Sequence, residues 1–364
     1  MSTTVNSFTP DYAIHPGEYL EEVLESREIS QRDLASRMGV REDYLSSIIH
    51  KKKPIGPDTA LKLEKVLDIS SNIWNNMNAN FRLFEAKLKE DAELATKKEW
   101  AKEFPLSWLK KNHYIPNTRN IEELIKPILN FFSITSPDVW QQYYKKTQAV
   151  YRNSSSFVSE QKATTTWLTA GIIKGKTIET EPYNKEVFIE NLHAIRKLTC
   201  EKSSVYIPKM TELCAKAGVA FVCVPLPPKV HVYAATKWLS PRKALICLSL
   251  RYKTNDQFWF SFFHEAAHIL YHSKKNVYIH DRSTKKDKNE IEANKVARQM
   301  LLPINKYNHF VERGKFYKSD IIAFSKQYKI APGIIVGALQ HDKKLEQGWH
   351  YKLKEKIDFT CYCE

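Results

Sequence analysis

The segment HEAAH, in which His264, Glu265 and His268 form an H-E-x-x-H pattern, constrains the fold of this chain more than any other stretch. On an α-helix, side chains four residues apart lie on one face, so both imidazoles can bind the same metal ion. Glu265 can then act as a general base on a water molecule at that ion. The pattern predicts a Zn²⁺ site on a helix over residues 257–273. The alternative is a buried helix with two structural histidines.

A catalytic zinc ion needs a third protein ligand, and a second expected helix over residues 288–302 offers two carboxylates. Glu290 lies on a helical face of small and polar residues, which allows close packing on the metal helix. Glu292 lies on a more mixed face, so we favour Glu290 as the ligand and keep Glu292 as the alternative. Asn294, one turn after Glu290, is placed to hydrogen-bond a histidine ligand. His272 fits a neighbour of the site better than a ligand.

A second local pattern, in residues 30–53, is that of two short helices joined by a tight turn. Ser30 is a good N-cap, and Gly39 suits the turn between the two helices. In a helix-turn-helix, the second helix reads base edges and nearby basic side chains contact phosphates. The residues that we expect to face DNA are Gln31, Arg41, Glu42, Asp43, Tyr44, Ser46, Ser47, His50, Lys51, Lys52 and Lys53. The alternative is a helical hairpin with a solvated lysine cluster.

The overall charge agrees with a polyanionic partner. Lys and Arg number 56 against 41 Asp and Glu, which gives a net charge of +15. Such an excess favours nucleic acid, although a generally basic protein would share it. We find no apolar run of the roughly 18 residues that a membrane helix requires, and no secretory pattern at the start. We therefore expect a cytoplasmic protein with no membrane partner.

The order of these patterns predicts a mostly helical α+β chain in four parts. The β-rich runs 219–226 and 243–250 are expected to form a small sheet beside the metal helix. The expected parts are a helix-turn-helix DNA-binding domain in 1–90, a helical linker region in 91–190, a zincin-like metallopeptidase domain in 191–310 and a C-terminal helical extension in 311–364.

The N-terminal part resembles the XRE-type helix-turn-helix of the HigA/VapI antitoxin-repressor family. The resemblance covers residues 14–88 and is carried by HPGEYLEEVL, DLASRMGV and PIGPDTALKLEKVLDISSNIWNNMNANFRLFEAK. Members bind operator DNA as dimers and commonly pair with an RNA-cleaving toxin. The resemblance therefore implies double-stranded operator DNA, a second copy of the chain and a toxin as partners. Arg41 stands where Ser is usual and His50-Lys51 where Asn-Gly is usual, which affects the base sequence that is read.

Residues 190–305 resemble the ImmA/IrrE metallopeptidase family. The matching stretches are GVAFVCVPLPPKVHVYAATKWLS, LSLRYKTNDQFWFSFFHEAAHILYH and EIEANKVARQMLLP. That family has a gluzincin-like site and acts on protein substrates, often regulators. The resemblance implies that His264, His268 and Glu290 bind Zn²⁺ and that Glu265 activates water. A cationic group for the oxyanion is expected too, but the spacing of the sequence does not locate it.

Together the two patterns predict a DNA-binding transcriptional regulator with a zinc-dependent metalloendopeptidase domain, which cleaves itself or a partner regulator. The competing prediction is a non-enzymatic HigA-like antitoxin and autorepressor that neutralises a toxin and has a structural or vestigial zinc site. The intact H-E-x-x-H pattern favours the first, and the complete antitoxin-like N-terminus favours the second. The two are not exclusive.

Overall fold

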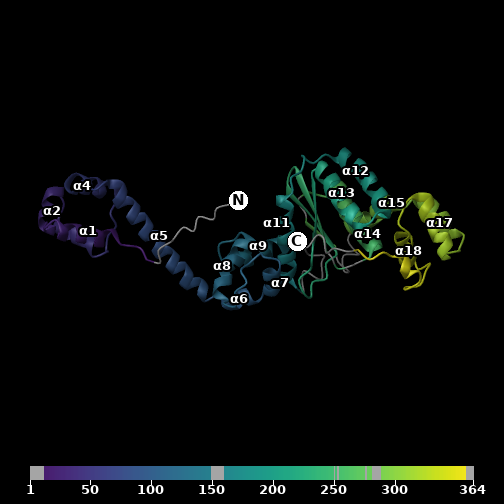
Figure 1. The fold of residues 1–364 in the computed structure, drawn as a ribbon, viewed down its shortest axis with the longest axis horizontal. Helices are drawn as coiled ribbons and strands as arrows, with labels where there is room; N and C mark the ends of the chain where they lie inside the picture. The colour runs from purple at the N-terminus through teal and green to yellow at the C-terminus, as the bar shows by residue number, and fades with distance from the viewer. Residues whose placement is uncertain are drawn as a thin grey trace. The chain divides into compact units, whose positions relative to one another are not determined.

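The computed structural model describes residues 12–148, 160–249, 251, 254–274, 277–280 and 288–357, and it confirms the predicted mostly helical α+β fold (Figure 1). The chain divides into two compact units, Met1–Lys98 and Glu99–Glu364, which we describe in turn. The four-part division predicted from the sequence stays a prediction. Within the described ranges, no helix combines the length and apolar character needed to cross a membrane.

The N-terminal unit is a bundle of short helices followed by one long helix. Its described elements are α1 (Pro16–Ser26), α2 (Gln31–Met38), α3 (Glu42–Ile49), α4 (Pro57–Leu67) and α5 (Ser71–Ala95). Ser30 caps α2, because its Oγ accepts a hydrogen bond from the Asp33 N–H at 3.1 Å. Gly39 ends α2 in the left-handed conformation, with φ of 63°. The cap and the turn predicted for the helix-turn-helix are thus both present.

The first and third helices pack closely at a glycine. A Cβ atom at Gly17 would overlap the backbone oxygen of Ile48, so α1 can contact the end of α3 only because residue 17 has no side chain. Leu34, Leu45 and Ile48 are fully buried in the core that the helices share. This core fixes α2 against α3, which sets the direction of the exposed face of α3.

The C-terminal unit combines many helices with one small sheet. Its described helices are α6 (Lys98–Lys102), α7 (Leu106–Lys111), α8 (Glu122–Phe132), α9 (Pro137–Gln148), α11 (Gln161–Thr177), α12 (Lys185–Lys197), α13 (Ser203–Lys216), α14 (Asn255–Tyr271), α15 (Lys288–Leu301), α16 (Ile304–Glu312), α17 (Lys318–Tyr328) and α18 (Pro332–His341), with short 3₁₀ turns η1 (Leu198–Cys200) and η3 (Tyr351–Leu353). Its described strands are β1 (Val219–Val224), β2 (Ala234–Ser240), β3 (Lys243–Ser249) and β4 (Val277–His280). The two β-rich runs of the sequence correspond to β1 and β3, whereas β2 and β4 were not predicted.

The sheet has the strand order β1-β3-β2-β4 and lies between two layers of helices (Figure 1). β1 pairs with β3 in parallel, and the other two pairings are antiparallel. One face is covered by α11, where a Cβ at Gly171 would lie 2.6 Å from Cys247 Sγ, so this helix also needs a glycine. The opposite face packs against α12, α13 and α14 in the main core of the unit. Residues of β2 that share a face with Ile246 of β3 therefore point toward α14.

The last helices belong to the same core as α14. Gly337 of α18 lies against the start of α14, where an added Cβ would be 2.7 Å from Asp256 Oδ2. Asp342, at the end of α18, forms a two-pronged ion pair with Arg298 of α15 and accepts a hydrogen bond from Tyr307 at 2.9 Å. These contacts tie α16 and α18 to the two helices that form the candidate metal centre.

Candidate metal centre and nucleic-acid interface

The H-E-x-x-H residues lie on α14, as the sequence predicts, although the helix begins and ends two residues earlier than expected. His264 and His268 are buried, and their Nε2 atoms lie 3.1 Å apart. The aromatic residues that precede them anchor this part of α14 in the core, since Phe262 and Phe263 are fully buried there. Burial lowers the pKa of His268 to about 4, so its imidazole is neutral near pH 7.

Helix α15 brings a carboxylate to the two imidazoles. Glu290 Oε2 lies 3.1 Å from His264 Nε2, and Glu290 Oε1 lies 3.3 Å from His268 Nε2. Helix α15 can approach α14 closely because the residues on this face, Ala293 and Ala297, are small, and both are fully buried. Burial opposes ionisation of Glu290, but the two histidines beside its carboxylate outweigh this and lower its pKa. Of the two carboxylates considered from the sequence, the structure brings Glu290 to both histidines.

The chemistry of this cluster fits a divalent cation. His264 Nδ1 lies 3.0 Å from Asn294 Oδ1, an acceptor, so the ring donates there and its Nε2 carries a lone pair. That lone pair faces a second imidazole nitrogen and a carboxylate in a buried space. Two imidazoles and one carboxylate are a known donor set for catalytic zinc, and a cation would satisfy all three groups. The assignment of these residues as metal ligands stays a prediction.

Glu265 is held on the sheet side of α14. Its side chain is fully buried, and Thr236 Oγ1 donates a hydrogen bond to Glu265 Oε2 at 2.6 Å. Burial raises the pKa of Glu265 well above its ordinary value, the hydrogen bond from Thr236 opposes this, and the charge of Glu290 adds to it. Thr236 lies opposite Ile246 in the β2–β3 pairing, and therefore on the face that α14 covers. Thr236 was not predicted, because a threonine in a strand carries no signal of its own.

Strand β4 supplies two further side chains that the sequence analysis missed. Tyr278 stacks on His268 and His280 stacks on His264, each pair with ring centroids 4.1 Å apart. Both residues share the α14-facing side of the sheet, since Tyr278 pairs with Thr236 and His280 pairs with Ala234. A nitrogen of His280 also lies within 4.8 Å of ligand atoms of His264 and Glu265. The alternation of VYIH is the signal that could have identified this strand.

The residues predicted to contact DNA occupy α3 and the turns around it. Most are exposed, and four are half-buried. The exposed ones are Arg41, Glu42, Asp43, His50, Lys51, Lys52 and Lys53, and the half-buried ones are Gln31, Tyr44, Ser46 and Ser47. Tyr44 and Ser47 already have partners inside the domain, as the Tyr44 hydroxyl lies 2.8 Å from Thr59 Oγ1 and Ser47 Oγ donates to the Tyr44 carbonyl at 2.6 Å. The assignment of these residues to DNA contacts therefore stays a prediction.

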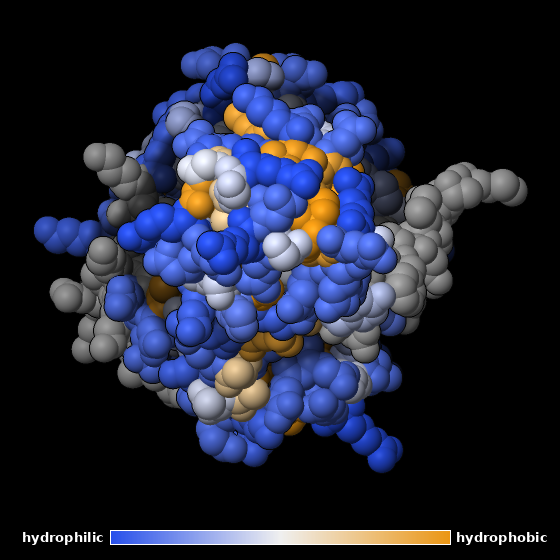
Figure 2. All heavy atoms as spheres, turned by 90° about the vertical axis from the view of Figure 1, so that its left-hand side faces the viewer, coloured by the Kyte–Doolittle hydropathy of each residue, from blue (hydrophilic) through white to orange (hydrophobic). Residues whose placement is uncertain are grey.

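The three consecutive lysines after α3 differ in their surroundings. Lys51 is in the left-handed conformation and forms an ion pair with Glu18 of α1. Lys53 Nζ lies 5.4 Å from the centre of the Tyr44 ring. The face of the molecule in Figure 2 is mostly hydrophilic, with hydrophobic residues in small interrupted areas. Lys51, Lys52 and Lys53 are exposed and can reach phosphates, although Lys51 must first leave Glu18.

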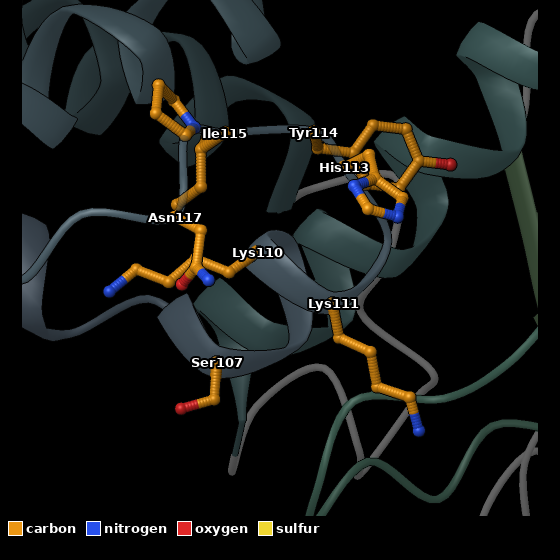
Figure 3. A pocket seen from close by; sticks show the side chains of 8 residues that line it. Ser107, Lys110, Lys111, His113, Tyr114, Ile115 and Asn117 are labelled. Carbon is orange, nitrogen blue, oxygen red and sulfur yellow. The ribbon is translucent and has the colours of Figure 1, made fainter.

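A cavity of about 900 Å³ lies in the C-terminal unit apart from these residues (Figure 3). It is formed by α7 and the loop after it, and its lining is Ser107, Lys110, Lys111, His113, Tyr114, Ile115, Pro116 and Asn117. The lining is basic, but it includes none of the residues predicted to bind metal or DNA. Lys110 also donates a hydrogen bond to the Thr118 carbonyl at 2.7 Å, so part of this charge is used within the protein.

Comparison with known proteins identifies two regions of the chain. Residues 20–74 match the family model described as Helix-turn-helix, and residues 226–335 match that of the IrrE N-terminal-like domain, a peptidase family. The chain is 29% identical over 76 residues to the uncharacterized HTH-type transcriptional regulator YddM of Escherichia coli (strain K12), covering 21% of this chain and 81% of that protein. It is 35% identical over 72 residues to virulence-associated protein I of Dichelobacter nodosus, covering 20% of this chain and 67% of that protein.

Solved structures are similar to this chain over a comparable length, and one of them illustrates the match. The Pseudomonas aeruginosa antitoxin HigA with the higBA promoter is 29% identical to this chain, with a TM-score of 0.22, and the match covers 22% of this chain and 90% of that one. Each of these three proteins matches about a fifth of this chain. The second region, residues 226–335, contains the H-E-x-x-H residues and Glu290.

Proposed function

Residues 20–74 belong to the helix-turn-helix family and residues 226–335 to the IrrE N-terminal-like domain family, and on this premise we propose a zinc-dependent metalloendopeptidase within a DNA-binding regulator. The peptidase would cleave the chain itself or a partner regulator. The observation that carries the proposal is the convergence of His264, His268 and Glu290 in a buried cluster, with the buried Glu265 next to His264 on α14. Two imidazole nitrogens and a carboxylate that face one another in a buried space do not stabilise a core by themselves. A bound cation gives this arrangement a purpose.

In this proposal, His264, His268 and Glu290 hold the ion, and Asn294 fixes the ring of His264. When bound, zinc supplies a Lewis acid that polarises the scissile carbonyl and makes water more acidic. Glu265 accepts the proton of the attacking water and delivers it to the leaving amine. Its raised pKa suits this exchange, because a carboxylate with an ordinary pKa would hold the proton too weakly.

Thr236 and the buried surroundings complete the proposed catalytic machinery. The hydroxyl of Thr236 holds one oxygen of Glu265, which leaves the other oxygen for the proton transfer. Glu265 Oε1 has no hydrogen-bond partner within the described part of the chain, although it is buried. An unpaired buried carboxylate oxygen is costly for stability, and a role in proton transfer explains why one is kept.

The N-terminal unit supports the regulatory half of the proposal. Ser30 caps the start of α2, and Gly39 forms the turn between α2 and α3. A shared core lies behind α3, and the exposed residues of α3 are followed by three lysines. We propose that α3 enters the major groove of double-stranded operator DNA and that the chain binds as a homodimer, so that two copies contact two half-sites. Cleavage would then change operator occupancy. The chain would act in the cytoplasm, where the operator lies.

The test is the substitution Glu265→Gln, which keeps the metal ligands and removes the base. Cells that express either chain are compared for the mass of the regulator and its candidate partners, and for an operator-linked reporter. We expect cleavage products in wild-type cells and none with Glu265→Gln, while both chains retain zinc. Equal products and equal reporter activity in the two strains would refute the peptidase.

A second candidate function is a HigA-like antitoxin and autorepressor that neutralises a toxin. The resemblance of residues 14–88 to the HigA/VapI antitoxin-repressor family favours it. In this case the zinc site would be structural or vestigial. Co-expression with the product of a neighbouring small gene tests it, since an antitoxin restores growth with Glu265→Gln as well as with the wild-type residue.

A further inference from the structure

The second nitrogen of His268 has a protein partner of its own. His268 Nδ1 lies 2.8 Å from Nδ1 of His272, which directly follows α14, one turn after His268. The far nitrogen of His272, Nε2, lies 3.3 Å from Glu292 Oε2 on α15. Three side chains thus form a line that leads from the candidate metal centre to the surface.

Burial differs along this line. The side chain of His272 is only 4% exposed, whereas that of Glu292 is 57% exposed. His272 also lies beside the Tyr278 ring, with centroids 5.5 Å apart, so β4 restricts its movement as well. The inner link is therefore held rigidly, and the outer link is open to water.

The hydrogen atoms can be assigned along this line in one consistent direction. If His268 Nε2 faces the ion, its Nδ1–H donates to His272 Nδ1. His272 is then protonated on Nε2, and this N–H donates to the Glu292 carboxylate. Each of the two hydrogen bonds along this line then has one donor and one acceptor.

We propose that His272 and Glu292 are positioning residues for His268, which orient its ring and fix its tautomer for metal binding. The inference rests on the proposed zinc site and adds a role for two residues that the sequence suggested only as a neighbour and an alternative ligand. It also separates the two histidine ligands, because Asn294 holds His264 from α15 while His272 holds His268 from its own helix. Partners of this kind typically change metal affinity by about 10-fold to 100-fold.

The test measures zinc affinity of the full chain, stripped of metal, by competition with a chromophoric chelator. The variants are His272→Phe, which keeps a ring without nitrogen, His272→Asn, whose Oδ1 can accept from His268, and Glu292→Ala. We expect His272→Phe to weaken zinc binding about 10-fold to 100-fold and to shift the visible spectrum of the Co²⁺-loaded chain. His272→Asn should recover most of this loss, and Glu292→Ala should weaken binding only about 2-fold to 5-fold because it is exposed.

Each result has a defined meaning. Equal zinc affinity of His272→Phe and the wild-type chain overturns the proposal, and so does an equal loss in His272→Phe and His272→Asn, since packing alone would then explain it. The melting temperature of the metal-free chains controls for folding, and His272→Ala replaces the Phe variant if the larger ring prevents folding. A wild-type chain that binds no zinc overturns both this inference and the proposed zinc peptidase. A zinc-binding wild type with an unaffected His272→Phe variant overturns the positioning role alone.

Discussion

The two functional regions of this molecule are built in opposite ways. The proposed DNA-binding face is assembled from residues 31–53, which are adjacent in sequence, and most of its side chains are exposed. The candidate metal centre is assembled from α14, α15, β2 and β4, and its proposed ligands have at most 5% exposure. One region depends on local helix signals and surface charge, and the other depends on packing between distant segments.

This difference has consequences for how each region fails. A substitution of an exposed residue on the DNA-binding face changes a contact with solvent or ligand, and the fold remains. A substitution at the metal centre leaves a buried polar group without a partner, which costs more because water cannot replace it. The two units also have separate cores, so damage in one should leave the other intact.

The largest effect is expected from His264→Ala. Removal of one of three ligands should lower zinc affinity by about 300-fold to 8,000-fold, since a binding free energy of roughly 10–16 kcal/mol is shared among three ligands. DNA affinity at fixed salt should not change. Metal analysis and a DNA-binding titration of the same preparation measure both, with His309→Ala, an exposed histidine of α16, as the matched control. Loss of DNA binding together with zinc would show that the two units are coupled.

The reciprocal effect is expected from Gly17→Ala. The added Cβ would overlap the Ile48 backbone oxygen, which cannot move without displacing α3, so we expect a loss of about 3 kcal/mol in the stability of the N-terminal unit. DNA affinity should fall while zinc content stays normal. Gly56→Ala, which meets no atom within 4 Å, is the matched control. Calorimetry should show that the N-terminal unit melts at a lower temperature. An unchanged thermogram would contradict the tight α1–α3 contact.

A smaller effect is expected from Thr236→Val, which keeps the shape of the residue and removes the hydroxyl. Both oxygens of the buried Glu265 would then lack a partner, so the metal-free chain should lose about 1.5–3 kcal/mol of unfolding free energy. Thr236→Ser retains the donor and should lose much less. Denaturant unfolding followed by a probe of the C-terminal unit measures this difference. Equal stability of the Val and Ser variants would mean that the hydroxyl does not hold Glu265.

The sequence was sufficient where the signal is local. The cap at Ser30 and the turn at Gly39 follow from a few adjacent residues, and both agree with the structure. The H-E-x-x-H helix was also predicted, although α14 begins and ends two residues earlier than expected. β2 and β4 were missed because they are stable only as parts of a sheet: AATKWLS has weak strand character alone, and VYIH is four residues long. Pairing with β3 and packing on α14 determine these strands, and neither can be read from a short window.

The same limit applies to the candidate metal centre. Helical spacing was enough to favour Glu290 over Glu292 and to place Asn294 on the same face of α15, and Glu290 is the carboxylate that lies beside both histidines. Thr236, Tyr278 and His280 required knowledge of which strand lies under α14 and in which register, and a shift of one residue would turn all three away from the site. Residues that contact the site from a different strand or helix therefore could not be predicted from the sequence alone.

The smallest effect concerns the lysines that follow α3. Each lysine that neutralises a phosphate contributes about 0.9 to the slope of log affinity against log salt. Lys52→Ala with Lys53→Ala should lower the slope on a mixed-sequence duplex by about 1.8, and Lys89→Ala, on exposed α5, should leave it unchanged. Lys51→Ala should lower it by less than 0.9, because in the free protein Lys51 pairs with Glu18 and exchanges one anion for another on binding.

Glu18→Gln sharpens this last comparison, since it frees Lys51 without touching the DNA-binding face. With Glu18→Gln in place, the contribution of Lys51 to the slope should rise toward that of its neighbours. A slope that is the same for Lys51→Ala in both backgrounds would mean that the ion pair with α1 does not compete with phosphate. Glu18 belongs to α1 and Lys51 follows α3. That result would therefore mean that α1 does not affect DNA binding and that the DNA-binding face depends only on residues close together in the sequence.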